Sequence, residues 1–213
     1  MNGPVIVPAV GDYLEEIIGA LRTGAVVALP TDTVYGLVCL PEHAEKLFTL
    51  KGRPADVNVQ VLVGRTSVAR SISLFPLQAE RLARRFWPGA LTLVVARAAG
   101  NSWNLGANQE TIGIRHPLHS VVLPLCLALG PLAATSANRH GEPVAASAAE
   151  IAAIFPDGLS LVLDGGECAG VASTVVDLTG PEPQCLREGA IAWKEISAAI
   201  EEGGNEFYWS GRE

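Results

Sequence analysis

The apolar residues of this chain occur in short runs that alternate with longer amphipathic stretches. A short apolar run between glycine, proline or polar residues is typical of a buried strand. Such runs predict strands at residues 25–29, 59–63, 91–96, 132–134 and 159–163. Apolar positions at helical spacing predict helices at residues 12–24, 41–50, 66–73, 76–86, 121–129, 147–154 and 190–200. The interleaved order predicts an α/β fold, in which a single domain holds a twisted mixed sheet flanked by helices.

Three further strands are predicted from other signals. Residues 111–115 alternate, which places Thr111, Gly113 and Arg115 on one face of a strand. Residues 173–178 and 184–187 are predicted to form a hairpin. Residues 98–110 are polar and irregular, as expected for a flap. We therefore expect one folded domain over residues 12–200, a lead-in at residues 1–11 and a polar tail at residues 201–213.

The composition favours one ordered domain with a large core. The 213 residues are 49% hydrophobic and 17% charged, so disorder is not expected over most of the length. The net charge of −7 and an aromatic content of 6% argue against an RNA-binding module that grips a phosphate backbone. They are compatible with a small basic pocket for one nucleotide.

Cysteine usage and hydropathy predict a cytoplasmic protein. No cysteine has a partner at Cys-x-x-Cys spacing or a histidine at zinc spacing, so small core residues in a reducing compartment are expected at Cys39, Cys126, Cys168 and Cys185. The N-terminus lacks the basic residues of a signal peptide. Residues 121–134 form the most apolar stretch, which is too short to span a bilayer.

Candidate chemistry begins where the strand at 25–29 ends. Thr31, Asp32 and Thr33 follow this strand and precede Tyr35 and Gly36. In α/β sheets, ligands bind at the carboxyl ends of strands, where hydroxyl groups can hold a small polar molecule. The alternative is a turn that satisfies only its own backbone, as Thr and Asp often do.

Three later motifs favour a binding site. Lys51-Gly52-Arg53-Pro54 follows a predicted helix, and Thr135-Ser136-Ala137-Asn138 ends a predicted strand. The third motif comprises residues 173–177 and 186–189 and includes Ser173 and Arg187. Arg115 adds a cation at a strand end on the predicted inner face. Because an unpaired buried charge is costly, Arg115 should bind a carboxylate or a phosphate.

These residues suggest charge stabilisation, since the motifs contain cations, hydroxyl groups and an amide. No nucleophile–histidine–acid set and no paired carboxylates accompany them. Gly-x-x-x-x-Gly-Lys-Ser/Thr and Gly-x-Gly-x-x-Gly are also absent from the sequence, so neither a P-loop nor a dinucleotide-binding turn is expected. Arginines that grip oxyanions bidentately predict a site that positions phosphates.

Together and in this order, the four motifs resemble the YrdC-type family of L-threonylcarbamoyl-AMP synthases, over residues 11–191. The resemblance implies that ATP, L-threonine and bicarbonate give threonylcarbamoyl-AMP and pyrophosphate. It also implies partner proteins that transfer the threonylcarbamoyl group to tRNA, and Mg²⁺ bound with ATP rather than in a dedicated protein site. Strong direct binding of nucleic acid is not expected.

The resemblance also implies roles for single residues. Lys51 and Arg53 correspond to catalytic positions. Threonine-binding positions correspond to Thr33, Arg115 and Ser173. The ATP-binding positions correspond to Lys51, Arg53, Thr111, Ala134, Ser136, Asn138, Val144 and Arg187.

The chain departs from the family pattern at a few positions. Val57 and Asn58 stand where the family usually has a lysine or asparagine followed by a proline, and Ser120 replaces a proline. These departures leave open an amine substrate other than threonine. A relative that uses carbamoyl phosphate is a second alternative, and a non-catalytic RNA-binding module is a third.

Overall fold

The computed structural model describes residues 3–52, 58–168 and 170–205 of the chain. The helices are α1 (Tyr13–Arg22), the 3₁₀ helix η1 (Pro41–His43), α2 (Glu45–Lys51), α3 (Thr66–Ile72), α4 (Leu77–Phe86), α5 (Val122–Leu129), α6 (Ala148–Ile154) and α7 (Trp193–Asn205). The strands are β1 (Val5–Pro8), β2 (Val27–Leu29), β3 (Gly36–Cys39), β4 (Gln60–Leu62), β5 (Ser73–Leu74), β6 (Leu91–Arg97), β7 (Thr111–Arg115), β8 (Leu132–Ser136), β9 (Leu161–Asp164), β10 (Thr174–Asp177) and β11 (Gln184–Arg187).

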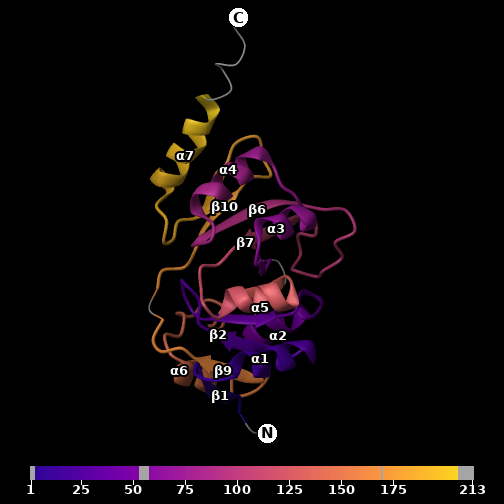
Figure 1. Ribbon diagram of the computed structural model, residues 1–213, viewed down its shortest axis with the longest axis vertical. Helices are drawn as coiled ribbons and strands as arrows, with labels where there is room; N and C mark the ends of the chain where they lie inside the picture. Colours follow the sequence, from indigo (N-terminus) through magenta and orange to yellow (C-terminus); the bar gives the residue numbers. More distant parts are fainter. Residues whose placement is uncertain (1–2, 53–57, 169, 206–213) are drawn as a thin grey trace, which may run out of the picture.

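The strands form one mixed sheet, which runs along the elongated molecule in Figure 1. The strand order is β1-β9-β2-β3-β8-β4-β7-β6-β10-β11, and β5 pairs with β6 beside this path. The pairs β1·β9, β9·β2, β4·β7 and β6·β10 are parallel, whereas the others are antiparallel. The expected single-domain α/β fold with a mixed sheet is therefore confirmed.

The two faces of the sheet bury different sets of side chains. On one face, Ile17 and Leu21 of α1 and Leu125 of α5 pack on β9, β2, β3 and β8. The opposite face carries a larger core, to which α2, α3, α4, α6 and α7 contribute. Because successive strand residues point to opposite faces, each strand supplies both sets.

The core beneath α1 and α5 does not extend along the whole sheet. On the same face, β4, β7, β6 and β10 direct residues into a cavity. Their alternate residues, such as Val61, Leu93 and Ile114, belong to the larger core on the opposite face. The cavity therefore has a well-packed floor.

Two terminal segments differ from the expected boundaries. Residues 1–11 were expected to be a lead-in, but Val5–Pro8 forms β1 and pairs with β9. The side chain of Val5 is 59% exposed, so this edge strand is held mainly by backbone pairing with β9. A strand that buries few side chains is hard to recognise from apolar residues in the sequence. At the other end, α7 continues beyond Ile200 to Asn205, into the segment expected to be a tail.

The helix expected at residues 41–50 is divided. Pro41–His43 forms η1, and Ala44 connects it to α2. At the end of α2, Gly52 adopts a φ of 60°, which is the left-handed conformation that commonly terminates a helix. The helix therefore ends at Lys51.

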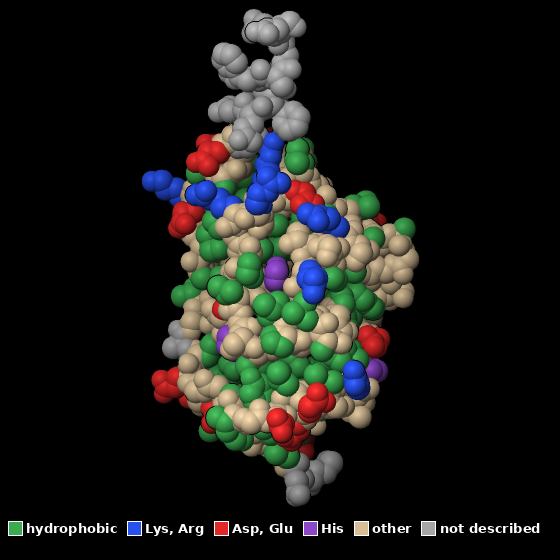
Figure 2. Space-filling view, viewed as in Figure 1, with side chains coloured by type: hydrophobic (Ala, Val, Ile, Leu, Met, Phe, Trp, Pro, Cys, Tyr) green, Lys and Arg blue, Asp and Glu red, His purple; other side chains and the backbone are tan. Residues whose placement is uncertain are grey.

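Charged side chains of both signs lie on the surface around α4 and α7. Figure 2 shows lysine and arginine side chains in the upper part of the molecule, with acidic side chains among them. Arg70 pairs with Glu80 of α4, whereas Arg84 and Arg85 are exposed. Across the described residues, no helix is both long enough and apolar enough to cross a bilayer.

We expect Ile196→Ala to lower the free energy of unfolding by about 2–4 kcal/mol, because it removes a fully buried side chain that packs in the core. Urea denaturation monitored by circular dichroism would measure the change. The control is Leu77→Ala on α4, where the side chain is 54% exposed. Equal losses in both variants would contradict the packing of α7 against the domain.

Candidate functional site

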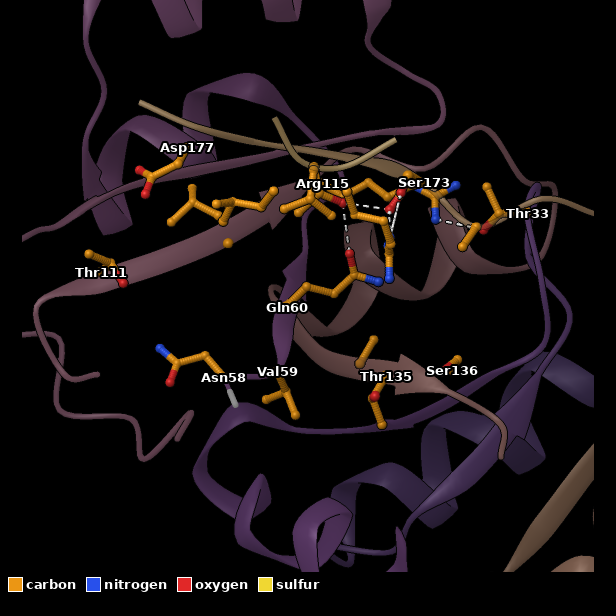
Figure 3. A pocket seen from close by; sticks show the side chains of 18 of the residues that line it. Thr33, Asn58, Val59, Gln60, Thr111, Arg115, Thr135, Ser136, Ser173 and Asp177 are labelled. Atoms are coloured by element: carbon orange, nitrogen blue, oxygen red, sulfur yellow. Dashed lines mark hydrogen bonds between the residues drawn. The ribbon is translucent and has the colours of Figure 1, made fainter. Parts of the chain in front are cut away.

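A cavity of about 530 Å³ lies on the part of the sheet face that the core beneath α1 and α5 leaves open. Its floor comes from alternate residues of neighbouring strands: Thr92 and Val94 of β6, and Thr111, Gly113 and Arg115 of β7. Figure 3 shows Arg115, Ser173 and Thr33 near one another, with Thr111 and Asp177 at the opposite end. The predicted alternation of residues 111–115 is confirmed.

Most of the predicted site residues line this cavity. They are Thr33, Thr111, Arg115, Ala134, Ser136, Val144, Ser173 and Arg187. Lys51 and Asn138 contact Ser136 without being part of the lining. Arg53 and Val57 lie outside the described residues. The structure thus brings three of the four sequence motifs to one cavity, and the fourth, around Lys51, adjoins it.

Lys51 supports the turn that follows β8. Its side chain is buried, and Nζ donates hydrogen bonds to the backbone oxygen of Ser136 (2.6 Å) and to Oδ1 of Asn138 (2.8 Å). Asn138 in turn donates through Nδ2 to the carbonyl oxygens of Arg139 and Glu142. These bonds hold the Ser136 hydroxyl at the edge of the cavity. A direct contact of Lys51 with nucleotide stays a prediction.

Arg115 is held by two other segments of the chain, and only 2% of the residue is exposed. Nε donates to the carbonyl oxygen of Gly89 (3.0 Å), and Nη1 donates to Oγ1 of Thr33 (2.8 Å). Nη2 lies 2.6 Å from Oδ1 of Asp32. Burial lowers the pKa of Arg115 from its ordinary value, and the negative charge of Asp32 opposes this shift.

The contact between Asp32 and Arg115 is an ion pair without hydrogen-bond alignment. Among the described residues, neither Oδ1 of Asp32 nor Nη2 of Arg115 has a hydrogen-bond partner. The contact therefore places the negative charge of Asp32 2.6 Å from the buried guanidinium. The buried arginine was expected to require an anion, and Asp32 supplies one from within the chain.

Arg187 adds a second cation to the same end of the cavity. Its Nε and Nη2 donate to the carbonyl oxygen of Ser173 at 3.1 and 2.9 Å, and Nη2 also donates to Oγ of Ser173 at 3.2 Å. Burial lowers the pKa of Arg187, and the nearby charge of Arg115 lowers it further. Two guanidinium groups close enough to repel each other create a site suited to anions.

The turn after β2 satisfies its own backbone and also supplies Thr33 to the cavity lining. Thr31 satisfies its own turn, since its Oγ1 accepts from the backbone N of Thr33 (3.1 Å) and donates to the backbone oxygen of Val34 (2.7 Å). The hydroxyl of Tyr35 donates to the carbonyl oxygen of Gly166 and accepts from the backbone N of Gly165, so both of these partners lie within the chain. Only Thr33 of these side chains lines the cavity.

Close backbone approaches bring the later motif to this turn. A Cβ atom at Gly170 would lie 1.8 Å from the carbonyl oxygen of Thr33, and one at Gly189 would lie 2.1 Å from that of Ala172. Only glycine fits such contacts. The chain can therefore bring Ser173 and Arg187 beside Thr33.

Hydrogen bonds hold the irregular segment at residues 98–110 beside the cavity. Arg97 donates to the carbonyl oxygens of Trp103 and Thr111. Asn58 donates through Nδ2 to the carbonyl oxygen of Asn108 (2.7 Å), and both asparagines line the cavity. Asn58, a departure from the family pattern, thus joins this segment to β4. Movement of the segment as a flap stays a prediction.

Sequence reasoning missed several polar residues of the cavity. Gln60 and Thr92 line the floor, and Asp177 lies at the end opposite Arg115 (Figure 3). Gln60 and Thr92 are each a polar residue inside an otherwise apolar strand run. That pattern could have identified them, because a polar side chain on a sheet face packs poorly unless it contacts polar partners.

Comparisons with known protein sequences identify a family that this chain matches. A family model for Sua5, YciO and YrdC proteins, described as "Telomere recombination", matches residues 19–189. A provisionally named threonylcarbamoyl-AMP synthase of Mycobacterium tuberculosis (strain ATCC 25618 / H37Rv) is 38% identical over 188 residues, which cover 86% of this chain and 87% of that protein. The threonylcarbamoyl-AMP synthase of Pyrococcus abyssi is 40% identical over 193 residues, which cover 86% of this chain and 56% of that protein.

Two solved structures share the fold. The crystal structure of P. abyssi Sua5 complexed with L-threonine aligns with a TM-score of 0.86 and 35% identity, covering 93% of this chain and 61% of that one. Escherichia coli YciO aligns with a TM-score of 0.83 and 25% identity, covering 92% and 100%. This chain therefore spans less than two thirds of the P. abyssi synthase sequence and of the P. abyssi Sua5 structure.

We expect Asp32→Ala to lower the free energy of unfolding by about 3 kcal/mol, because it leaves the buried Arg115 guanidinium without the opposite charge beside it. Urea denaturation at neutral pH would measure the loss. Asp157→Ala, which removes an exposed carboxylate, is the matched control. A change within about 0.5 kcal/mol of that control would mean that Asp32 does not stabilise Arg115.

Proposed function

The chain belongs to the Sua5/YciO/YrdC family, and we propose that it is an L-threonylcarbamoyladenylate synthase. The proposed reaction converts ATP, L-threonine and bicarbonate into threonylcarbamoyl-AMP, pyrophosphate and water. The observation that supports it best is the cavity end formed by Thr33, Arg115 and Ser173. The relatives that carry this enzyme name are 38% and 40% identical to the chain.

Arg115 is suited to bind the threonine carboxylate. A guanidinium has five N–H groups, and the chain contacts Arg115 at one point on each of the three nitrogens. Both Nη1 and Nη2 thus retain an N–H that can donate to a ligand. The buried contacts fix the plane of the guanidinium before the ligand arrives, which reduces the entropy cost of binding.

The remaining residues suit a nucleotide. Arg187, Ser136 and Thr111 offer a charge and hydroxyl groups along the cavity, and Ala134 and Val144 offer apolar surface. Arg53 is proposed for the triphosphate from the family pattern, and Lys51 for support of the Ser136 turn. We propose that the bound threonine nitrogen forms a carbamate with carbon dioxide derived from bicarbonate. A carbamate oxygen then attacks the α-phosphorus, and the bond to pyrophosphate breaks.

This chemistry depends on positioning and charge rather than on a protein nucleophile. Among the described residues that line the cavity, Asp177 is the acidic one, and its Oδ1 accepts from the backbone N (2.8 Å) and Oγ1 (2.6 Å) of Thr179. Fixed donors aimed at developing negative charge can supply most of such a rate enhancement.

We also propose Mg²⁺ as the companion of ATP. The described residues contain no group of three or more His, Cys, Asp or Glu side chains placed to hold a metal ion. Mg²⁺ usually keeps several water ligands and binds substrate phosphates, so the triphosphate and water can supply most of its ligands. In this proposal the enzyme acts in the cytoplasm, and partner proteins transfer the threonylcarbamoyl group to tRNA.

We expect purified protein to release pyrophosphate from ATP only when bicarbonate and L-threonine are both present. A coupled pyrophosphate assay with each amino acid in turn would measure this requirement. Release with a different amine would identify that amine as the substrate. Release that requires carbamoyl phosphate would show that the chain is a relative that uses carbamoyl phosphate. Absence of release, with salt-dependent binding of tRNA, would favour the RNA-binding alternative.

We expect Arg115→Lys to raise the KM for threonine about tenfold or more and to leave the KM for ATP nearly unchanged, because lysine keeps the charge but loses the planar fork. Arg187→Ala should instead raise mainly the KM for ATP. Steady-state kinetics with Arg84→Ala as an exposed control would measure both effects. Equal effects of Arg115→Lys on both substrates would contradict the carboxylate assignment.

A further inference from the structure

Gln60 occupies the middle of the cavity floor. In the sheet it pairs with Gly113 of β7 on one side and with Ala134 of β8 on the other. Neither neighbour has a side chain larger than a methyl group, so the long side chain of Gln60 extends into open space between them. Figure 3 shows this side chain directed toward Arg115 and Ser173.

A chain of hydrogen bonds connects Gln60 to Arg187. Nη2 of Arg187 donates to Oγ of Ser173 (3.2 Å), and Oγ of Ser173 lies 2.8 Å from Oγ1 of Thr92. Oγ1 of Thr92 then donates to Oε1 of Gln60 (2.9 Å). We call these four side chains the relay. Each member comes from a different strand or loop, so the relay spans the cavity floor.

The direction of the relay follows from Arg187. A guanidinium can only donate, so the hydroxyl of Ser173 accepts from Arg187 and is free to donate to Thr92. Thr92 then donates onward to the carbonyl oxygen of Gln60. The reverse direction would leave the Ser173 proton without a place in the relay. In this direction every hydroxyl proton of the relay has an acceptor, and the direction matches the amide orientation in the structure, in which Oε1 of Gln60 faces Thr92.

This orientation leaves the amide nitrogen of Gln60 as a hydrogen-bond donor in the cavity. With Oε1 engaged by Thr92, the amide group of Gln60 presents Nε2 and its two N–H groups elsewhere. None of the hydrogen bonds among the described residues involves Nε2 of Gln60. Gln60 also lies between β7, which carries Arg115, and β8, which carries Ser136. It is thus placed between the proposed threonine end and proposed nucleotide contacts.

We propose that Gln60 contacts the ligand and that its Nε2 donates a hydrogen bond to an anionic oxygen at the reaction centre, carried either by the carbamate or by the α-phosphate. Thr92 is the positioning residue that holds the amide in this orientation. The inference rests on the proposed synthase function and assigns a role to a side chain in its cavity. A neutral donor at this point stabilises negative charge and adds no cation that would bind pyrophosphate after the reaction.

The test compares Gln60→Glu with Gln60→Met. The introduced carboxylate can still accept from Thr92, so the relay is kept while an anion replaces the donor. We expect Gln60→Glu to lower kcat/KM about 100-fold or more, the loss typical for a missing oxyanion donor, and Gln60→Met about tenfold. Gln78→Glu on α4, which makes the same charge change outside the cavity, is the control and should match wild type.

The pH dependence separates a ligand contact from a structural role. A protonated carboxyl group can donate a hydrogen bond where the amide did. The deficit of Gln60→Glu relative to wild type at the same pH should therefore shrink as the pH falls toward the ordinary carboxyl range, whereas that of Gln60→Met should stay constant. Parallel deficits at all pH values would overturn the donor role.

Thr92 variants test the positioning step. Thr92→Val keeps the shape but breaks the relay, and should lower kcat about three- to tenfold by letting the amide turn. Thr92→Ser restores the hydroxyl and should recover most of that loss. Equal activity of Thr92→Val and Thr92→Ser would show that the relay does not orient Gln60.

Binding of AMP by calorimetry distinguishes the two oxygen sources. Weaker AMP binding by Gln60→Glu would assign the contact to the α-phosphate, and unchanged binding with reduced turnover would assign it to the carbamate. If the wild-type protein releases no pyrophosphate in a threonine-dependent manner, both the proposed function and this inference are contradicted. An active wild type with both Gln60 variants within about twofold of it would overturn this inference alone.

Discussion

A buried guanidinium is the constraint on which the site depends. A charge as inaccessible as that of Arg115 is tolerated only where opposite charge and hydrogen-bond acceptors surround it. The chain meets this requirement from three segments, because Asp32 and Thr33 follow β2, Gly89 follows α4, and Arg115 ends β7. Satisfying one side chain therefore brings together three segments that are distant in the sequence. Nη1 and Nη2 each carry a second N–H beyond these contacts, so a residue that stabilises the fold also has donors for the proposed ligand.

The sheet explains why a cavity exists at all. The core beneath α1 and α5 covers one end of a sheet face, while the core on the opposite face continues beneath the whole cavity. Strand alternation then places apolar residues of β6 and β7 in that continuous core and their polar neighbours in the cavity. The polar residues of the floor need no helix above them, since a ligand or water can satisfy them. A rigid floor with a solvent-filled upper side is a favourable basis for preorganised donors.

Much of this arrangement could be predicted from the sequence, and the failures have physical causes. The alternation of residues 111–115 identified the cavity face of β7, because period-2 patterning is a local signal. The edge strand β1 was missed because pairing with β9 stabilises it more than burial does. The ion pair between Asp32 and Arg115 could not be predicted, since the two residues are brought together only by the sheet. The hydrogen bonds of the Tyr35 hydroxyl with Gly165 and Gly166 could not be predicted for the same reason, because these residues are distant in the sequence.

The distribution of charge in the cavity bears on how such a site can release its products. Arg115 is partly neutralised by Asp32, and Arg187 is oriented by the backbone of Ser173, so both cations are already engaged before a ligand binds. Fully exposed cations would bind a triphosphate tightly in the ground state and would gain little more in the transition state. Cations that the protein holds in place, together with neutral hydroxyl and amide donors, mainly stabilise negative charge that forms at one position in the transition state. The arrangement therefore favours differential stabilisation of that charge over tight binding of the phosphates.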